Sequence, residues 1–571
     1  MNQPPIDVLI LGGGPAGSTL ASILLRHRPT TRIRILERDS FPRFHVGETM
    51  VAEINLVLAE QGAYDAVAAA GFVKKFGATF RWGADDRPWN LVFATMDELR
   101  APQDKVTNVQ TAYTWHVDRA EYDRILLDTA VAAGAELVRA SARELVREGD
   151  RVVGVVDTQG TVTRARFVVD ATGQAGLEGS AADRVLDPHL RNVAYWGYYR
   201  GFGFEDALNG TPDRSRAFIV AHPFGWSWYF PIRDDLLSVG VVTRADDRPK
   251  LAPEALFQAA IASCPELTRL LAGAELVPYA PDAPLVHVIR DYSYLSTTIT
   301  QPGLVRVGDA AGFVDPILSV GCFLAQTGAR HLAYSLRTLL DGTPGLDEAT
   351  VLGGYADHAS ETLRAFRDLT WFFYRFNERP DAWWAQARAL VADNGFPSQA
   401  TDRHAFAAFA SGFAGRKAVF REPNGMFGEP FFAEAFTRLV DPTGAPPPSP
   451  PRVSKTDRPR LRGPVELRPS AVPLDGAGRV IPALRVEVRT PSAHAGDQLV
   501  RRLFVPPSMA PLFAWLDGQH DVAALTNRLQ AELQVAPEHQ PTLVRYVRGV
   551  VEGLAARGLV DGVGRAQQAT T

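Results

Sequence analysis

The chain has 571 residues, a net charge of −4, 46% hydrophobic residues and 22% charged residues. This length predicts two or three globular domains, and the slightly acidic balance excludes the strongly basic surface of a protein that binds nucleic acid or an anionic membrane. The two cysteines, Cys264 and Cys322, are too few and too far apart for a disulfide framework or a metal cluster.

The first residues have neither the basic segment nor the apolar core of a secretion signal, and the apolar stretch from Val8 to Leu11 is only strand-sized. No run of about 18 apolar residues is present, so we expect no transmembrane helix. These features predict a soluble, cytoplasmic protein without a nucleic-acid or membrane partner.

The order of the expected elements predicts an α/β fold. Residues 6–37 have the pattern of a β-α-β unit, with a helix at 15–27 between apolar strands at 6–11 and 33–36. Further elements are expected in this order: a helix at about 120–133, strands near 136–139, 152–157 and 166–169, and a strand, loop and helix at 304–335. Residues 190–245 alternate apolar and polar positions, as in an antiparallel sheet. We therefore predict a doubly wound, Rossmann-like domain over 1–345, with a substrate sheet inserted at about 75–115 and 185–300.

The remaining chain divides into three stretches. Residues 346–440 are expected to be mostly helical and are rich in aromatics. Residues 441–464 contain a proline-rich segment and are predicted to be a linker. Residues 465–571 are predicted to form a small C-terminal α/β domain, either a docking module or a lid over the substrate cleft.

Between the first strand and its helix lies Gly12-Gly13-Gly14-Pro15-Ala16-Gly17, which fits G-x-G-x-x-G in the context that this motif requires. Gly12 permits the tight turn, Gly14 lets the backbone approach a pyrophosphate, and Gly17 lets helix and strand pack closely. The helix start, with Pro15 first and Ala16 following, offers the free N–H groups of Ala16 and the next residues to the phosphates. Glu37 ends the second strand, where it can accept hydrogen bonds from a ribose.

Three further segments predict FAD as the cofactor. Val307-Gly308-Asp309-Ala310-Ala311 resembles the late Gly-Asp motif of the FAD monooxygenase superfamily, which implies that Asp309 and the neighbouring Gly312 contact the flavin. Val117 to Glu121 resembles the superfamily's arginine-bearing helix start, which implies the same for Arg119. Asp170, in Asp170-Ala171-Thr172-Gly173, fits the strand end on the adenosine side. The chain has no second G-x-G-x-x-G of comparable quality, which argues against a separate NAD(P)H domain.

Across roughly residues 5–340 the sequence resembles the flavin-dependent halogenases. Gly225-Trp226-Ser227-Trp228-Tyr229-Phe230-Pro231 matches their G-W-x-W-x-I-P motif, with Phe230 in place of Ile. The resemblance implies that Trp226 and Trp228 lie beside the flavin and disfavour direct monooxygenation. The two indoles would keep organic substrate away from the flavin peroxide.

A second segment, Phe313-Val314-Asp315-Pro316-Ile317-Leu318-Ser319-Val320-Gly321, fits F-x-x-P-x-x-S-x-G at every fixed position. The resemblance implies that this loop, with Ser319, lies against the isoalloxazine and that the amides of Val320 and Gly321 hold the halide. Backbone amides supply aimed donors without a charge that would hold the anion too tightly.

A third segment, Lys75-Phe76-Gly77-Ala78-Thr79-Phe80, resembles the K-x-[GA]-x-x-F segment of the family. It implies that Lys75, rather than Lys74, is the catalytic lysine. A protonated lysine can polarise hypohalous acid, whereas a neutral lysine can form a haloamine. Burial lowers the pKa of a lysine and permits the neutral form.

Phe41 to Glu48 resembles a family segment beside the flavin, which makes His45 and Glu48 candidate proton-handling groups and Arg38 and Arg43 candidate cofactor contacts. A second segment of the family resembles Arg290-Asp291-Tyr292-Ser293-Tyr294. Some relatives attach FAD covalently through an aspartate there, so Asp291 is a candidate link, although a plain structural aspartate is the alternative.

One position departs from the tryptophan halogenases, which carry a glutamate immediately before the serine of the loop motif, where this chain has Leu318. The resemblance is therefore to the branch that acts on phenol, pyrrole or acyl substrates, many of them tethered to a carrier protein. A phenol would need a base to activate its ring, and the sequence does not reveal one.

The resemblance implies a complete reaction. An NAD(P)H-dependent flavin reductase delivers FADH2, O2 adds at C4a to give a hydroperoxide, and chloride or bromide attacks it. The resulting hypohalous acid passes to Lys75 and halogenates an aromatic or acyl substrate in natural-product biosynthesis. The alternatives are a single-component FAD monooxygenase, a prenyl reductase of the geranylgeranyl-reductase type, and a flavin-binding interaction protein without catalysis. The prenyl reductases are expected to carry a cysteine near the position of His45.

Overall fold

The computed structural model describes residues 6–82, 89–92, 113–177, 183–204, 215–246, 248–376, 453–474, 477–491, 498–556 and 559–563. No helix in this part of the chain combines the length and the apolarity that a membrane span requires.

The first sheet has five parallel strands in the order β20 (Leu304–Arg306), β10 (Val162–Asp170), β1 (Ile6–Leu11), β2 (Ile33–Glu37) and β7 (Glu136–Arg139). The short strand β19 (Thr300–Gln301) runs antiparallel at one edge, and β8 (Ala142–Glu148) and β9 (Arg151–Asp157) extend β10 as an antiparallel ribbon. Val8, Leu9 and Ile10 are completely buried, as expected for a parallel strand covered on both faces. The helices α1 (Pro15–His27), α5 (Arg119–Ala132) and α8 (Gly321–Leu340) pack around this sheet.

The second sheet has the order β16 (Glu275–Val277), β12 (Asn192–Arg200), β15 (Leu236–Arg244), β14 (Gly225–Arg233), β13 (Arg216–His222), β4 (Gly77–Arg81) and β5 (Trp89–Val92), with β17 (His287–Arg290) also paired to β12. Its pairs are antiparallel except β13 with β4. These strands lie within the two ranges predicted for an inserted sheet.

Both faces of the second sheet are covered, and alternation along each strand decides which side chain serves which face. Tyr195 and Tyr229 pack with Phe257 of α6 (Pro253–Ala262), next to α7 (Pro265–Leu270). Trp196 and Trp226, from the same strands, point to the opposite face and pack toward α8 and the long helix α9 (Glu348–Phe376). The alternation of side chains along each strand therefore places these tryptophans on the face that borders the first domain.

Shorter elements join the two sheets. They are β3 (Val73–Lys75) paired with β6 (Thr114–His116), the ribbon of β11 (Arg184–Leu186), β18 (Tyr294–Ser296) and β21 (Gly312–Phe313), and the helices α2 (Ile54–Gln61) and α3 (Tyr64–Ala69).

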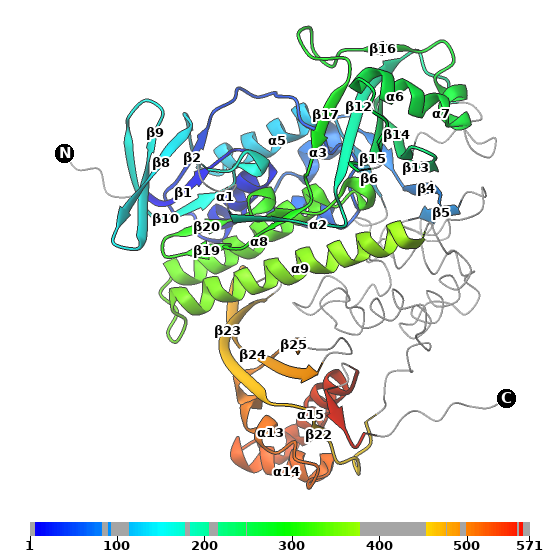
Figure 1. Cartoon of the computed structure of the whole chain (residues 1–571). Coiled ribbons are helices and arrows are strands. Elements are labelled where there is room, and N and C mark those ends of the chain that lie inside the picture. The colour runs from blue at the N-terminus through cyan, green and yellow to red at the C-terminus, as the bar shows by residue number, and fades with distance from the viewer. Residues whose placement is uncertain are drawn as a thin grey trace, which may run out of the picture.

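The C-terminal unit consists of the meander β23 (Val465–Leu474), β24 (Arg479–Pro491) and β25 (Gln498–Val505), the helices α13 (Ala510–Ala514), α14 (Val522–Glu532) and α15 (Gln540–Ala556), and the pair β22 (Arg460–Leu461) and β26 (Val560–Asp561). Figure 1 shows this unit beneath α9, coloured yellow to red. The β23–β24 hairpin docks on the core: Val480 N–H donates to Thr338 Oγ1 at 3.1 Å, and Arg337 donates to the carbonyl of Ala477 at 2.9 Å.

The predicted α/β class is confirmed: a doubly wound flavin-type domain carries an added antiparallel sheet and a small C-terminal unit. The helix expected at 120–133 and the strands near 136–139, 152–157 and 166–169 are present as α5, β7, β9 and β10. Of the region predicted to be helical, 346–440, residues 348–376 form α9 and 377–440 lie outside the described residues. The predicted linker 441–464 also lies outside them up to 452, and its later part carries β22.

Candidate functional site

One elongated cavity of about 540 Å³ runs from the carboxyl ends of β1 and β2 to the aromatic face of the second sheet. This volume is typical of a cofactor or ligand pocket. Its wall contains most of the residues predicted from the motifs, namely Gly12, Gly14, Pro15, Ala16, Glu37, Arg38, Arg43, His45, Glu48, Arg119, Trp226, Trp228, Asp309, Ser319 and Gly321. The other candidates, Gly17, Lys75, Asp170, Asp291, Gly312 and Val320, lie outside this wall.

The glycine turn between β1 and α1 forms one end of the cavity. Gly12 has φ of +106°, and a Cβ there would lie 2.4 Å from the carbonyl oxygen of Ala171. A Cβ on Gly17 would lie 2.0 Å from the carbonyl oxygen of Gly12. Gly14 is the N-cap of α1, with Pro15 as the first helical residue, so the free N–H groups of this helix start face the cavity. Only glycine fits at the two crowded positions, and the turn can receive an anionic pyrophosphate.

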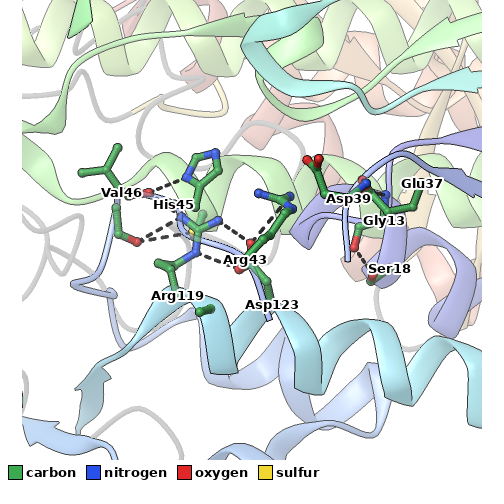
Figure 2. A network of polar contacts seen from close by, with 12 residues as sticks. Gly13, Ser18, Glu37, Asp39, Arg43, His45, Val46, Arg119 and Asp123 are labelled. Atoms are coloured by element: carbon green, nitrogen blue, oxygen red, sulfur yellow. Dashed lines mark hydrogen bonds and ion pairs between the residues drawn. The ribbon is translucent and has the colours of Figure 1, made fainter. Parts of the chain in front are cut away.

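Glu37 closes the same end. Its Oε2 accepts from the N–H of Gly13 at 2.7 Å and its Oε1 from the N–H of Asp39 at 2.8 Å (Figure 2). Because a carboxylate has about four acceptor sites, two remain for a ribose. The side chain that the sequence assigned to ribose binding thus also fixes the glycine turn.

Arg119 lies in the middle part of the cavity wall. It is the first residue of α5, whose N-cap Asp118 accepts from the N–H of Ala120. Its guanidinium donates to both carboxylate oxygens of Asp123, at 2.7 and 2.9 Å, and to the carbonyl of Val46 at 2.6 Å (Figure 2). Burial alone would lower the pKa of Arg119, but the Asp123 carboxylate raises it, so the group stays charged.

This arginine ties α5 to the segment that carries His45, whose ring borders the cavity. Desolvation by the surrounding protein, together with the charge of Arg119, lowers the pKa of His45 to about 4. His45 is therefore neutral near pH 7.

Two predicted aspartates take different roles. Asp309 lines the cavity, and burial raises its pKa to about 6. Asp170 is completely buried outside the cavity wall and accepts from the N–H and hydroxyl of Thr172, at 3.1 and 2.6 Å. Asp170 thus shapes the turn after β10, and Thr172 and Gly173 line the cavity in its place.

The loop before α8 forms the other end. Asp315 caps a short 3-10 turn by accepting from the N–H of Ile317 at 3.0 Å. Ser319 then adopts the left-handed region with φ of +57°, and Val320 is the N-cap of α8, which begins at Gly321. The first turn of a helix leaves its N–H groups without intrahelical acceptors. Since Ser319 and Gly321 line the cavity, this helix start lies at the cavity, where free N–H groups could receive an anion.

Trp228 belongs to a hydrogen-bond chain that ends on a buried carboxyl. Its Nε1–H donates to Ser238 Oγ at 3.2 Å, and Ser238 donates to Glu48 Oε2 at 2.7 Å. Tyr198 donates to the other oxygen of Glu48 at 2.7 Å. Burial raises the pKa of Glu48 to about 7, although these two donors oppose the shift. Glu48 can therefore exchange a proton near neutral pH.

Trp226 belongs to a second chain. Its Nε1–H donates to the hydroxyl of Tyr374 in α9 at 2.7 Å, and that hydroxyl lies 3.2 Å from Asp315 Oδ1. Asn192 Nδ2 donates to Asp315 Oδ2 at 3.1 Å and to the Tyr374 hydroxyl at 3.2 Å. Burial raises the pKa of Asp315 to about 7. The tryptophan motif, the loop before α8 and α9 are thus joined at one hydroxyl.

Lys75 is buried, with 2% of its surface exposed, and does not line the cavity. Its Nζ donates to the carbonyl of Met50 at 2.7 Å, and Met50 follows Thr49, which is in the wall. Desolvation lowers the pKa of Lys75 to about 7, while the charge of Glu53 opposes that shift. The lysine therefore lies directly behind the wall and is half-protonated near pH 7.

Asp291 adopts a left-handed backbone with φ of +51° and forms an ion pair with Arg191 at 2.6 Å. The turn after β17 directs its carboxylate to this arginine rather than into the cavity. Gly312 contributes instead to a smaller cavity behind the larger one.

The sequence reasoning missed several polar residues of this site, namely Tyr198, Ser238, Asn192, Asp315, Tyr374 and Glu53. Asp315 occupies a variable position inside a matched motif, which was the one available signal. The others lie outside the motifs and join the site only through folding.

A profile of the tryptophan halogenase family matches residues 7–103 and 97–442. The tryptophan 2-halogenase of Chondromyces crocatus is 30% identical over 422 residues, covering 71% of this chain and 75% of that protein. The 1H-pyrrole-2-carbonyl-[peptidyl-carrier protein] chlorinase of Pseudomonas fluorescens is 33% identical over 347 residues, covering 58% and 75%. Among solved structures, the myxobacterial chondrochloren halogenase CndH superposes with a TM-score of 0.59 at 29% identity, covering 71% of this chain and 98% of that one.

Proposed function

Because the chain belongs to the tryptophan halogenase family and is a flavin-dependent halogenase, we propose that it chlorinates or brominates an aromatic or activated acyl substrate, with Lys75 directing the oxidised halogen. FAD, delivered reduced by a separate NAD(P)H-dependent flavin reductase, supplies the electrons that activate dioxygen, and oxidation of the halide then gives hypohalous acid.

The cavity wall fits this cofactor. The glycine turn at Gly12 and Gly14, with the helix start behind it, suits a pyrophosphate, and Glu37 has free acceptor sites for a ribose. Arg119 and Asp309, which both line the cavity, would contact the middle of the cofactor. The isoalloxazine would then lie between the Phe41–Glu48 segment and the loop at Ser319.

The amides at Val320 and Gly321 are the proposed halide site. They begin the 20-residue helix α8, so the helix dipole favours an anion at this end. Ser319, with its left-handed backbone, ends the 3-10 turn directly before this helix start. No full charge is needed, so the halide is held loosely enough to react.

Trp226 and Trp228 separate two compartments in this proposal. Their indole N–H groups are anchored, at 2.7 and 3.2 Å, to Tyr374 and Ser238, so the rings cannot swing out of the wall. Hypohalous acid made on one side would then pass along the wall near Thr49 to Lys75.

The single observation that carries the Lys75 proposal is a buried amine whose pKa is about 7 and whose Nζ is fixed by the Met50 carbonyl. A fixed amine of this kind supplies both the protonated form, which polarises hypohalous acid, and the neutral form, which can bond halogen. Glu48, with its pKa near 7, is proposed to exchange the proton that the reaction releases.

We propose that the substrate is a phenol, a pyrrole or an acyl group, and that a carrier protein presents it. Leu318 stands where the tryptophan enzymes have a glutamate, and one relative is a chlorinase of a pyrrole held on a peptidyl-carrier protein. This setting belongs to natural-product biosynthesis.

The test combines purified protein, FAD, a flavin reductase, NADH, dioxygen, bromide and a phenol probe, with products read by mass spectrometry. Lys75→Ala is expected to lower bromination of a bound substrate by at least ~100-fold, because the halogen is no longer captured. The variant should instead release hypobromous acid, which the phenol probe scavenges, or form peroxide. The matched control is Lys74→Ala, whose exposed ammonium lies over the Tyr113 ring at 4.7 Å and should not matter. Hydroxylated product, or NADH oxidation without the reductase, would instead establish a single-component monooxygenase.

A further inference from the structure

A second, smaller cavity of about 50 Å³ lies between α8, α9 and the turn from Gly308 to Phe313. Glycine, alanine, leucine and phenylalanine make up most of its wall, including Gly312, Gly328, Ala359 and Leu363. One water-sized molecule needs only roughly 10–15 Å³, so this α8–α9 cavity has room for a small ligand.

Two of the polar side chains in the wall direct their hydrogen bonds away from the cavity. Thr327 donates its hydroxyl to the carbonyl of Phe323 at 2.6 Å, and Tyr355 donates to the carbonyl of Arg306 at 2.9 Å. The ring of His358 lies edge-on against His331, with the centroids 4.8 Å apart. The wall also contains the Asp309 carboxyl and the Thr362 hydroxyl. An anion needs aimed donors and would be repelled by the Asp309 carboxylate, so this wall does not suit an anion.

The small cavity shares part of its wall with the large one. Asp309, Phe313, Gly321 and Ala325 line both. Two of these, Phe313 and Gly321, belong to the loop that we propose to lie against the flavin ring. A ligand in the α8–α9 cavity would therefore be one layer of residues away from the place where the flavin reacts.

We propose that the α8–α9 cavity binds dioxygen and supplies it to the flavin from behind the Gly321 loop, an inference that rests on the proposed function. Dioxygen is small and apolar and needs no hydrogen bond. Dry apolar cavities in proteins bind gases such as xenon for the same reason. The halide, which needs N–H donors, would use the opposite side of the same loop, so the two small reactants do not compete for space.

Two substitutions test the site by filling it. A Cβ on Gly328 would meet only Val307 Cγ2, at 3.9 Å, so Gly328→Ala adds a methyl group without a clash. Ala359→Leu fills more of the space from the α9 side. The matched control is Gly353→Ala in α9, where a Cβ meets nothing within 4 Å and the residue does not line the cavity. Both glycine substitutions lie within helices, where alanine is favoured over glycine.

Xenon is the first probe. Crystals of the wild-type protein pressurised with xenon are expected to show one xenon atom between α8 and α9, at reduced occupancy in Gly328→Ala and absent in Ala359→Leu. Gly353→Ala should match the wild type. An empty cavity in xenon, or bromide bound there in crystals soaked in bromide, would overturn the proposal.

The second readout is the reoxidation of reduced FAD on the protein, followed by stopped flow over a range of dioxygen concentrations without substrate. The second-order rate constant is expected to fall about threefold in Gly328→Ala and about tenfold in Ala359→Leu, with FAD affinity unchanged. Equal rate constants in all variants would refute the supply role. Xenon binding without halogenation would count against the proposed function alone, whereas halogenation with an empty cavity would count against this inference alone.

Discussion

The two ends of the large cavity are built on different principles. At the nucleotide end, defined by the Gly12–Gly17 turn and Glu37, the proposed cofactor contacts would come from backbone amides and tight glycine packing. At the halide end, defined by Glu48, Asp315 and the adjacent Lys75, three buried ionisable groups have pKa values near 7. Ligand binding at the first end depends on the shape of the backbone and is expected to be insensitive to pH. The behaviour of the second end depends on the protonation states of its three ionisable groups.

This difference in pH dependence between the two ends suits a halogenase. Above about pH 7, where Asp309 with its pKa of about 6 is already ionised, cofactor affinity should remain constant while catalysis changes, because Glu48, Asp315 and Lys75 lie away from the phosphates and the ribose. The following predictions would break or sharpen this contrast.

The largest effect is expected at the nucleotide end. Gly12→Ala forces a side chain into a left-handed backbone with its Cβ 2.4 Å from the carbonyl oxygen of Ala171. FAD affinity should fall by more than ~100-fold at every pH, about 3 kcal/mol, as measured by titration calorimetry. Gly353→Ala is the control, and circular dichroism establishes that both variants fold. Retention of wild-type affinity would mean that the turn does not hold the cofactor.

The next effect concerns Glu48. Its folded pKa of about 7 exceeds its ordinary value of 4.5, so its stabilising contribution is complete below about pH 4.5 and is lost as the pH rises through 7. The shift corresponds to ~3 kcal/mol. In urea unfolding of the apo protein, Glu48→Gln should remove that much of the stability difference between low pH and pH 8. An unchanged pH profile would show that Glu48 does not titrate near neutrality.

A smaller effect is expected for Tyr374→Phe. The change removes the hydroxyl that joins Trp226, Asn192 and Asp315, and so loosens the loop that begins α8. The KM for bromide should rise about 5–10-fold, about 1 kcal/mol, with little change in kcat or FAD affinity. Tyr355→Phe, in the same helix but bonded to the carbonyl of Arg306, is the control. A fall in kcat alone would contradict a positioning role.

The smallest effect is expected for Asp291→Asn. Its ion pair with Arg191 is partly exposed and contributes less than about 1 kcal/mol. FAD affinity should change less than twofold, and denatured wild-type protein should show no flavin adduct by mass spectrometry. A covalent adduct lost in the variant would require the turn after β17 to rearrange toward the cavity.

The same contrast governs what could be predicted from sequence. The nucleotide end follows from adjacent residues, since strand, glycine turn and helix are continuous in the chain, and Gly12, Gly14 and Glu37 lie where the pattern predicts. The halide end depends on long-range contacts, such as that between Asn192 and Tyr374, which no local pattern encodes. The motif predicted Lys75 as the catalytic lysine but not its position behind the wall, because that position depends on the pairing of β3 with β6.

The position of Asp170 illustrates the same limit. Its place at a strand end predicted a cofactor contact, yet its carboxylate turns back to Thr172, since a buried aspartate at a turn satisfies local N–H and hydroxyl donors first. Only the folded geometry decides between a ligand contact and a residue that shapes the turn.

The β23–β24 hairpin has a consequence for engineering. The hydrogen bonds described above between the C-terminal unit and α8 all come from this hairpin. They hold the C-terminal end of α8, the helix whose first turn is the proposed halide site. The helices α13, α14 and α15 form their own core with Val486 and Val505. A chimaera that keeps the hairpin and exchanges only the helices would transplant the outer module while leaving the anchorage of α8 untouched.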